Sequence, residues 1–210
     1  MSVETLKHDH FGRIELVRGD GDAFIRRDTG AAARGLRWFS GWVARREARA
    51  LRALDGLAGV PRLLRDERGI VARSYIAGLP MQEAQPRDPA YFRAARRLVL
   101  AMHARGVAHN DLAKEPNWLV TEAGAPAVID FQLAWFGARR SGFFRMLAMQ
   151  DLRHLLKHKR SYCPQALSPV ERRVLARRSW LARTWKATFK RGYWLVTRKL
   201  LRWQDNEGKG

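Results

Sequence analysis

The chain has 210 residues, which is enough for one globular domain with or without an appendage. A hydrophobic content of 46% and an aromatic content of 10% allow a packed core and exclude a disordered chain. With 40 basic and 20 acidic residues the net charge is +20, which predicts an anionic partner. The single cysteine, Cys163, excludes an intramolecular disulfide framework.

The first third of the chain predicts an antiparallel sheet and one helix. Alternating apolar residues predict strands at 3–7, 13–17 and 23–27, and a glycine- and aspartate-rich hairpin turn precedes the third. A helix is predicted from about residue 40 to 57. Two further strands are predicted at residues 61–64 and 70–76.

In the remainder of the chain the apolar residues recur mainly at the spacing that is typical of helices. A helix is predicted over residues 89–105, followed by an irregular loop over 109–116. Short strands at 118–120 and 127–129 flank a turn, and helices are predicted beyond Phe136. The fold class predicted is α+β, with a small sheet and one helix before a mostly helical part that contains a hairpin.

Two segments with acidic residues lie beside this predicted hairpin. One covers residues 109–117 (HNDLAKEPN) and the other covers residues 129–132 (IDFQ). Carboxylate and amide oxygens are ligands that Mg²⁺ prefers, and a carboxylate can also orient a hydroxyl group by accepting its proton. Asn117 and Asp130 are suitable oxygen ligands that strand pairing can bring together, and Asp111 suits the role of the orienting carboxylate.

These two segments resemble the catalytic loop and the metal motif of the protein-kinase-like superfamily. The run at residues 102–109 (MHARGVAH) is similar to small bacterial RIO-type and lipopolysaccharide-kinase-type members. The resemblance covers about residues 4–160. It implies a bilobal fold, ATP and Mg²⁺ as cofactors, Asp111 as the catalytic residue, and Asn117 and Asp130 as metal ligands. Lys114 either reaches the transferred phosphate or is a solvated loop lysine.

The resemblance also implies nucleotide-binding residues in the first third of the chain. Arg26 stands where the family has a strand lysine, and a slip of one residue would place Arg27 there instead. Glu47 resembles the helix glutamate that pairs with this cation. Tyr75 and Ile76 lie in the hinge segment, whose backbone would bind the adenine.

Some features depart from the family pattern. Five residues instead of four separate Asp111 from Asn117, Gln132 replaces the glycine of the metal motif, and the strand lysine and glycine-rich lid are missing. Asp151 resembles the helix aspartate that braces the catalytic loop, which is a structural role. His8 and His10 are weak candidates for metal ligands, since no third ligand lies near them in the sequence.

The positive charge is concentrated near the C-terminus. Residues 137–203 carry 18 basic and two acidic residues, whereas residues 1–136 carry 21 basic and 16 acidic residues. Within this part, residues 180–203 have aromatic side chains on one helical face and basic ones mainly outside it. Packing on the catalytic body, an anionic membrane surface and RNA are the interpretations that this pattern leaves open.

We predict an N-lobe over residues 1–77, a C-lobe over 78–160 and a basic helical extension over 161–210. The predicted function is ATP-dependent transfer of the γ-phosphate to a hydroxyl acceptor by a RIO-like serine/threonine protein kinase. One alternative is a lipopolysaccharide or sugar-lipid kinase, and another is a nucleotide-binding pseudokinase or RNA-associated scaffold. The expected location is the cytoplasm, either free or peripheral at the inner face of the membrane.

Overall fold

The computed structural model describes residues 2–9, 12–19, 23–30, 37–67, 69–137 and 141–176. The chain divides into two units, Met1–Ser168 and Pro169–Gly210, within each of which residues contact one another more than they contact the other unit. The second unit is described over the helix α5 (Pro169–Ala176). The segment 180–203 and the side chains of His8 and His10 lie outside what is described. Among the described helices, none has an apolar stretch that would reach across a bilayer.

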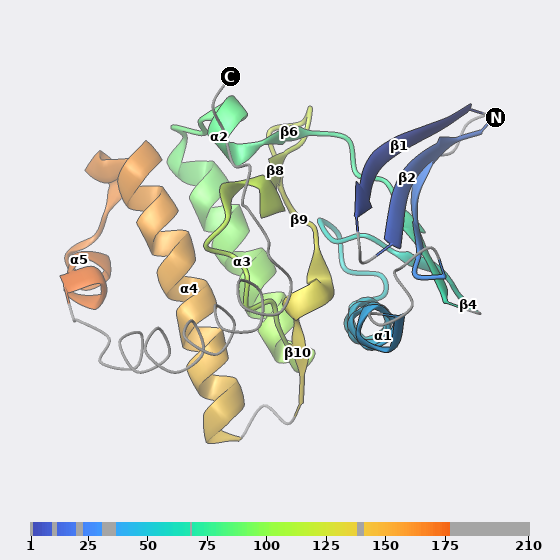
Figure 1. The fold of residues 1–210 in the computed structure, drawn as a ribbon. Coiled ribbons are helices and arrows are strands. Elements are labelled where there is room, and N and C mark those ends of the chain that lie inside the picture. The colour runs from blue at the N-terminus through green and yellow to red at the C-terminus, as the bar shows by residue number, and fades with distance from the viewer. Residues whose placement is uncertain are drawn as a thin grey trace, which may run out of the picture. The chain divides into compact units, whose positions relative to one another are not determined.

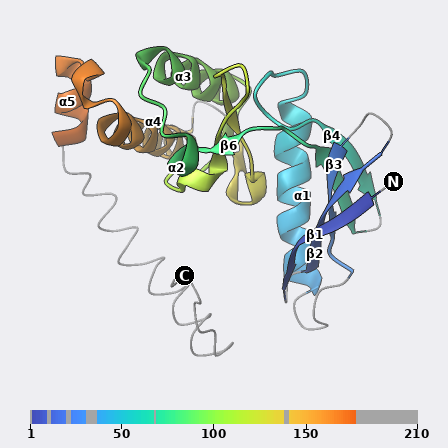
Figure 2. The same ribbon diagram turned by 90° about the horizontal axis from the view of Figure 1, so that it is seen from above.

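A five-stranded antiparallel sheet and one helix form the predicted N-lobe (Figures 1 and 2). The strands have the order β1-β2-β3-β5-β4. The elements are β1 (Ser2–Asp9), β2 (Gly12–Arg18), β3 (Ala23–Asp28), α1 (Arg37–Ala53), β4 (Leu63–Glu67) and β5 (Ile70–Ser74). The three strands predicted at 3–7, 13–17 and 23–27 are confirmed as β1, β2 and β3. The strand predicted at 61–64 lies at 63–67, and the one predicted at 70–76 ends at residue 74.

The predicted end of the first helix is wrong. α1 ends at Ala53 instead of residue 57, and Gly56 follows with a φ of 73°. A left-handed residue cannot continue an α-helix, and glycine adopts this conformation at low cost. Leu54 and Leu57, whose spacing extended the prediction, therefore reach the core from a turn.

The C-lobe is mostly helical and contains short strand pairs (Figure 1). Its helices are α2 (Met81–Ala84), α3 (Pro89–Ala104) and α4 (Gly142–Tyr162), with 3-10 helices η2 (Glu115–Asn117), η3 (Phe131–Leu133) and η4 (Pro164–Ala166). The strands β6 (Leu79–Pro80), β8 (Trp118–Val120) and β9 (Pro126–Val128) form one sheet, and β7 (Val107–Ala108) pairs with β10 (Trp135–Phe136). The two-residue strands were not predicted, because two residues show no alternation.

One hydrophobic core joins the end of α1 to the C-lobe. Leu51 and Leu54 pack in the same buried cluster as Met102, Trp118 and Phe131. After α1, the chain approaches the β8–β9 hairpin so closely that Val128 donates a backbone hydrogen bond to Gly59 at 2.8 Å. A Cβ atom on Gly59 would lie 2.9 Å from the Pro126 carbonyl oxygen. This contact positions the strand that leads to the predicted metal motif.

The helix α4 passes residue 160, where the sequence placed the start of a separate extension. It ends at Tyr162, and the buried Cys163 packs in the main core. The division by contacts therefore falls between Ser168 and Pro169, because the residues after 160 still bury side chains in the first unit. The division predicted between residues 77 and 78 stays a prediction.

Candidate active site

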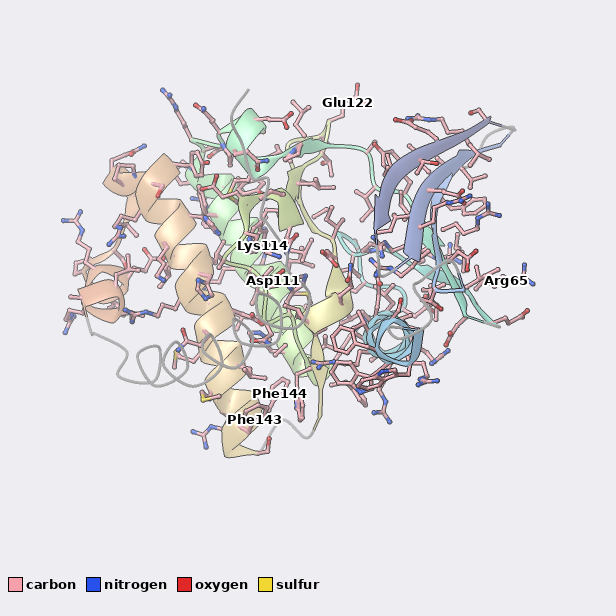
Figure 3. The ribbon with its side chains drawn as sticks, in the orientation of Figure 1. Arg65, Asp111, Lys114, Glu122, Phe143 and Phe144 are labelled. Carbon is pink, nitrogen blue, oxygen red and sulfur yellow. The ribbon has the colours of Figure 1, made fainter. Side chains whose placement is uncertain are left out.

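The loop between β7 and η2 brings Asp111, Lys114 and Asn117 into direct contact. Asn117 Nδ2 donates to the Asp111 carbonyl oxygen at 3.0 Å and to Asp111 Oδ2 at 3.1 Å. Lys114 Nζ lies 3.0 Å from the same carboxylate oxygen (Figure 3). The Asp111 side chain is 14% exposed and that of Lys114 is 62% exposed. The loop thus presents a carboxylate that is held from two sides and is still reachable from solvent.

The additional residue in this loop does not separate its two ends. Lys114 N donates to the Asp111 carbonyl oxygen at 3.4 Å, and Asn117 N donates to the Lys114 carbonyl oxygen at 3.2 Å. These turns, the second of which is the 3-10 helix η2, shorten the loop. The distance between Asp111 and Asn117 is therefore set by hydrogen bonds and not by the number of residues between them.

The β8–β9 hairpin places Asp130 beside this loop. Trp118 pairs with Val128, and Ile129 N donates to the Asn117 carbonyl oxygen at 3.0 Å. Asp130 follows directly and has a φ of 67°, in the left-handed region that non-glycine residues seldom occupy. Such conformations cluster at functional sites, where the surrounding structure holds them. The strand pairing predicted to bring these residues together is present.

The polar atoms of Asn117 and Asp130 fit a small, hard cation. Asp130 Oδ1 is buried and has no hydrogen-bond partner in the part of the chain that the structure describes. A buried carboxylate oxygen is unfavourable unless a donor or a cation compensates it. The amide nitrogen of Asn117 is bound to Asp111, which leaves its oxygen as the atom that could bind a metal. Carboxylate and amide oxygens with water and phosphate are the ligands that Mg²⁺ prefers.

Asp151 on α4 holds the backbone at the start of the predicted catalytic loop. Its carboxylate accepts hydrogen bonds from His109 N at 2.8 Å and from Asn110 N at 2.9 Å. His103 Nε2 lies 3.0 Å from the same carboxylate, which is fully buried. The bracing role predicted for Asp151 is confirmed by these contacts.

The other end of the loop is held by side chains that the sequence reasoning did not assign. His158 Nε2 lies 2.8 Å from the Leu112 carbonyl oxygen, and Trp118 Nε1 donates to the same oxygen at 3.2 Å. Tyr162 Oη donates to Glu115 Oε2 at 2.8 Å. Burial and this hydrogen bond raise the pKa of Tyr162 to about 12. α4 therefore supports both ends of the catalytic loop.

His109 links the catalytic loop to the metal motif. One of its ring nitrogens, Nε2, lies 3.0 Å from the Ile129 carbonyl oxygen, and its ring packs on Phe131 with centroids 4.7 Å apart. Burial lowers the pKa of His109, with Asp151 opposing the shift. A neutral, fully buried imidazole is therefore expected two residues before Asp111, in contact with the residue that precedes Asp130.

His154 on α4 makes the stability dependent on pH. Burial lowers its pKa from 6.5 to about 4, Lys157, Arg153 and His158 reinforce the shift, and Asp151 opposes it. Below pH 6.5 the unfolded chain binds more protons at this residue, so acidification disfavours folding. Between pH 7 and pH 5 we expect this residue to lower the free energy of unfolding by about 2 kcal/mol.

Urea unfolding at both pH values checks this expectation. A His154→Gln variant should lose less free energy of unfolding than the wild type between pH 7 and pH 5, because glutamine does not titrate. An equal loss in the two proteins would show that His154 does not carry the effect.

A buried charge cluster joins α1 to the sheet at Glu47. Arg73 Nη1 donates to Glu47 Oε1, and Arg27 Nε lies 3.6 Å from Glu47 Oε2. Glu47 is fully buried, and the side chains of Arg27 and Arg73 are 6% and 10% exposed. Burial, and after it the charge of Arg27, lower the pKa of Arg73 to about 10 against the opposing charge of Asp130. The metal motif therefore lies within electrostatic reach of this cluster.

The predicted pairing of Arg26 with Glu47 is wrong by one residue. Arg26 pairs across strands with Glu15, its Nη2 lying 2.6 Å from Glu15 Oε2. Successive residues of a strand point to opposite faces, and the face of β3 that carries Ile25 and Arg27 is the buried one. Arg27 is therefore the strand arginine that pairs with Glu47, as expected if the alignment of β3 with the family shifts by one residue. Phosphate binding by Arg26 stays a prediction.

Arg73 was missed by the sequence reasoning. It lies in β5, and a weak signal for it exists, since an arginine among the apolar residues of this strand must find a buried partner. Only the three-dimensional structure shows that this partner is Glu47.

The predicted hinge lies close against another strand at each of its ends. Tyr75 N donates to the Ala23 carbonyl oxygen at 3.1 Å, which extends the sheet by one bond. At the other end, a Cβ atom on Gly78 would lie 2.8 Å from the Val120 carbonyl oxygen. Tyr75 is exposed and Ile76 is half-buried. Binding of adenine at Tyr75 and Ile76 stays a prediction.

Arg46 connects α1 to the segment that follows the metal motif. Its Nη2 donates to the carbonyl oxygens of Leu133 at 3.1 Å and Ala134 at 2.9 Å. Its guanidinium also lies over the Trp42 ring at 4.6 Å. Because Arg46 precedes Glu47 and η3 follows Asp130, this side chain connects the helix of Glu47 to the segment after the predicted metal motif.

Replacement of Arg46 by alanine is expected to impair activity more than stability. The free energy of unfolding should fall by about 1–2 kcal/mol, the typical value for lost charged hydrogen bonds, and phosphate transfer should fall about tenfold if α1 and η3 lose their alignment. Urea unfolding and a transfer assay measure the two effects. Arg45→Ala, at an exposed neighbour on α1, is the control. Equal behaviour of the two variants would refute the coupling.

Comparisons with known proteins support the fold. No protein-family model and no curated protein matches the sequence. Among solved structures, the Rio2 kinase from Chaetomium thermophilum matches with a TM-score of 0.60 and 14% identity, over 83% of this chain and 61% of that one. Its ADP/Mg²⁺-phosphoaspartate complex matches with a TM-score of 0.58 and 15% identity, over 83% and 59%.

The chain has a protein-kinase-like fold. The predicted α+β, bilobal kinase-like architecture is thereby confirmed, with the sheet and α1 as one lobe and the helices around the β8–β9 hairpin as the other. The chain spans about three fifths of the Rio2 kinases that it matches. Closer kinship with small bacterial RIO-type or lipopolysaccharide-kinase-type proteins stays a prediction.

Proposed function

We propose that this kinase-like protein is an ATP-dependent phosphotransferase that moves the γ-phosphate to a hydroxyl acceptor. The observation that carries the proposal is that Asp111, Asn117 and Asp130 are brought to one end of the β8–β9 hairpin. Asn117 contacts Asp111 directly, and its backbone pairs with the residue before Asp130. A kinase-like fold with these groups together fits phosphoryl transfer, which depends mainly on positioning and charge neutralisation.

Each residue of the loop has a role in this proposal. Asp111 accepts or orients the proton of the attacking hydroxyl, and Asn117 keeps its carboxylate in place. Lys114, which contacts Asp111, reaches the transferred phosphate from the same loop. Asn117 and Asp130 hold Mg²⁺, which neutralises the phosphates of the bound nucleotide.

The N-lobe contributes positive charge to the nucleotide site. Arg27 and Arg73 supply two formal positive charges around the single carboxylate of Glu47. An anionic phosphate can be balanced by this excess, since arginine binds phosphate well although it differs from lysine in shape. Tyr75 and Ile76 provide the backbone groups for the adenine.

A serine or threonine side chain of a protein is the acceptor that we propose. The resemblance of residues 102–109 to RIO-type members supports this choice. A sugar lipid at the inner membrane surface is the other acceptor class, and the net charge of +20 suits either an anionic acceptor or an anionic location. The proposed location is the cytoplasm, with residues 180–203 as a contact for anionic membrane or RNA.

A nucleotide-binding pseudokinase is the second candidate function. The family's strand lysine is replaced, and the arginine in its place lies against Glu47 from a buried position. Such a protein would bind Mg-ATP without transferring phosphate.

Radiolabel transfer from ATP in a fractionated lysate, together with nucleotide binding, tests the proposal. Wild-type protein should label a protein fraction in the presence of Mg²⁺, and Asp130→Asn should reduce the labelling at least a hundredfold because the metal loses its charged ligand. Thermal shift with Mg-ATP separates the two candidates, since a pseudokinase would show the shift without labelling. Labelling by Asp130→Asn at the wild-type rate would disprove the assignment.

A further inference from the structure

A band of exposed aromatic and apolar side chains covers one side of α1, η3, β10 and the start of α4. We refer to it as the aromatic face. Its members are Trp38, Phe39, Trp42, Leu133, Trp135, Phe136 and Phe143. Trp38 is 73% exposed and Phe143 is 43% exposed. Large exposed aromatic surfaces of this kind are rare on soluble monomers and mark sites of interaction.

These residues form one connected surface although they come from separate elements. On α1, the Trp38, Phe39 and Trp42 rings lie in succession with centroids 5.9 Å apart. The Trp135 and Phe143 rings touch edge to face with centroids 4.9 Å apart, which joins β10 to α4. Arg46 lies over both Trp42 and Trp135 and so connects the two halves. Figure 3 shows Phe143 and Phe144 at the N-terminal end of α4.

The exposed charge on α1 and α4, the two helices of the aromatic face, is of one sign. α1 carries five arginines, and its only carboxylate, Glu47, is fully buried in the charge cluster. α4 likewise carries a single carboxylate, Asp151, which is fully buried against the catalytic loop. Arg45, Arg49 and Arg145 are exposed. The helices that carry this face therefore present positive charge and no exposed carboxylate.

This combination selects one kind of partner. A second copy of this chain carries a charge of +20, so the arginines beside the aromatic face would repel it. The same repulsion disfavours the basic residues 180–203 as the partner. RNA recognition by aromatic residues requires open ring faces on which bases stack. Here Phe39 stacks on Trp42, whose ring also lies under Arg46, and Arg49 lies over Phe136. Tryptophan and phenylalanine flanked by arginine match the interfacial region of an anionic bilayer.

We propose that the aromatic face is a docking surface for an anionic phospholipid membrane. Trp38 and Phe143, at opposite ends of the face, enter the interface between headgroups and acyl chains, and the surrounding arginines contact the lipid phosphates. The inference is independent of the phosphotransfer activity. It also differs from attachment through residues 180–203, because it assigns the contact to the folded kinase-like unit.

Flotation of the full-length protein with vesicles tests the proposal. The vesicles contain phosphatidylglycerol and phosphatidylcholine, and pure phosphatidylcholine vesicles serve for comparison. Trp38→Ser combined with Phe143→Ser should weaken binding to the anionic vesicles at least ~10-fold, because the bound protein no longer buries these two aromatic side chains in the membrane. Met149→Ser, an exposed apolar residue of α4 outside the face, is the matched control and should stay within about twofold of the wild type.

Two further measurements separate the proposal from its alternatives. Brominated phosphatidylglycerol should quench tryptophan fluorescence of the wild type more than that of the Trp38→Ser variant, which retains the other tryptophans. A variant with Trp185→Ser and Trp194→Ser measures the contribution of the C-terminal segment. Wild-type vesicle binding by a folded Trp38→Ser/Phe143→Ser protein would overturn the proposal, and so would a loss confined to RNA binding or to the C-terminal variant.

Discussion

Replacement of Asp111 by asparagine is expected to lower the rate of phosphate transfer about 10²–10⁴-fold, the range that positioned general bases contribute. Asparagine has the shape of aspartate but cannot accept the proton of the acceptor hydroxyl. Because Asn117 and Lys114 contact the Asp111 carboxylate from the loop itself, the loop geometry should be preserved. The Michaelis constant for ATP should change little, so the loss should appear in kcat.

Steady-state kinetics with labelled ATP measure this loss. Asp55→Asn, which removes an exposed carboxylate after α1, provides the control and should retain full activity. Thermal unfolding of both variants shows whether the change is confined to catalysis. Transfer by Asp111→Asn at the wild-type rate would exclude this residue as the catalytic base.

Replacement of Glu47 by alanine is expected to destabilise the protein by about 3–5 kcal/mol, because removal of one partner leaves buried charges uncompensated. Arg73 and Arg27 both lie against this carboxylate, and all three side chains are at most 10% exposed. Since ordinary domains are stable by only about 5–15 kcal/mol, the variant is expected to unfold near room temperature or to aggregate.

The control for this prediction is an exposed ion pair in the same sheet. Glu67 lies 3.0 Å from Arg65, and its side chain is 62% exposed. Glu67→Ala should lower the free energy of unfolding by no more than about 1 kcal/mol, the usual value for surface pairs. Urea unfolding measures both variants, and Glu47→Gln shows how much of the loss is due to charge. Equal stability of Glu47→Ala and Glu67→Ala would contradict the structural importance assigned to the buried cluster.

Arg46 lies between the aromatic face and the segment that follows the predicted metal motif. This arginine contacts rings of the aromatic face and the carbonyl groups of Leu133 and Ala134. Its neighbour on α1 is Glu47, and η3 begins directly after Asp130. A membrane bound at this face would therefore touch elements that also position the charge cluster and the metal motif.

Several structural features were predictable because their signals are local. The hairpins of the first sheet follow from alternation and turn residues, and the start of α3 follows from the Asp88 cap and Pro89. The candidate site was also recognisable, since its residues lie in two short segments on either side of one hairpin. The bracing contact of Asp151 was predictable only through the family resemblance.

Other features were not predictable, because they depend on which faces of distant elements meet. The sequence allowed either Arg26 or Arg27 to face Glu47, and the choice depends on the side of the sheet against which α1 packs. The partners of Arg46 and His158 lie 87 and 46 residues away along the chain. No local pattern specifies such contacts.

The order of elements and the identity of the polar residues at the hairpin were determined by the sequence alone, because turn propensity and side-chain periodicity act over a few residues. The tertiary structure decided which arginines balance Glu47, how α4 holds the catalytic loop, and that seven apolar side chains form one surface. The physical reason is that burial and charge pairing are settled only when elements far apart in the chain pack together.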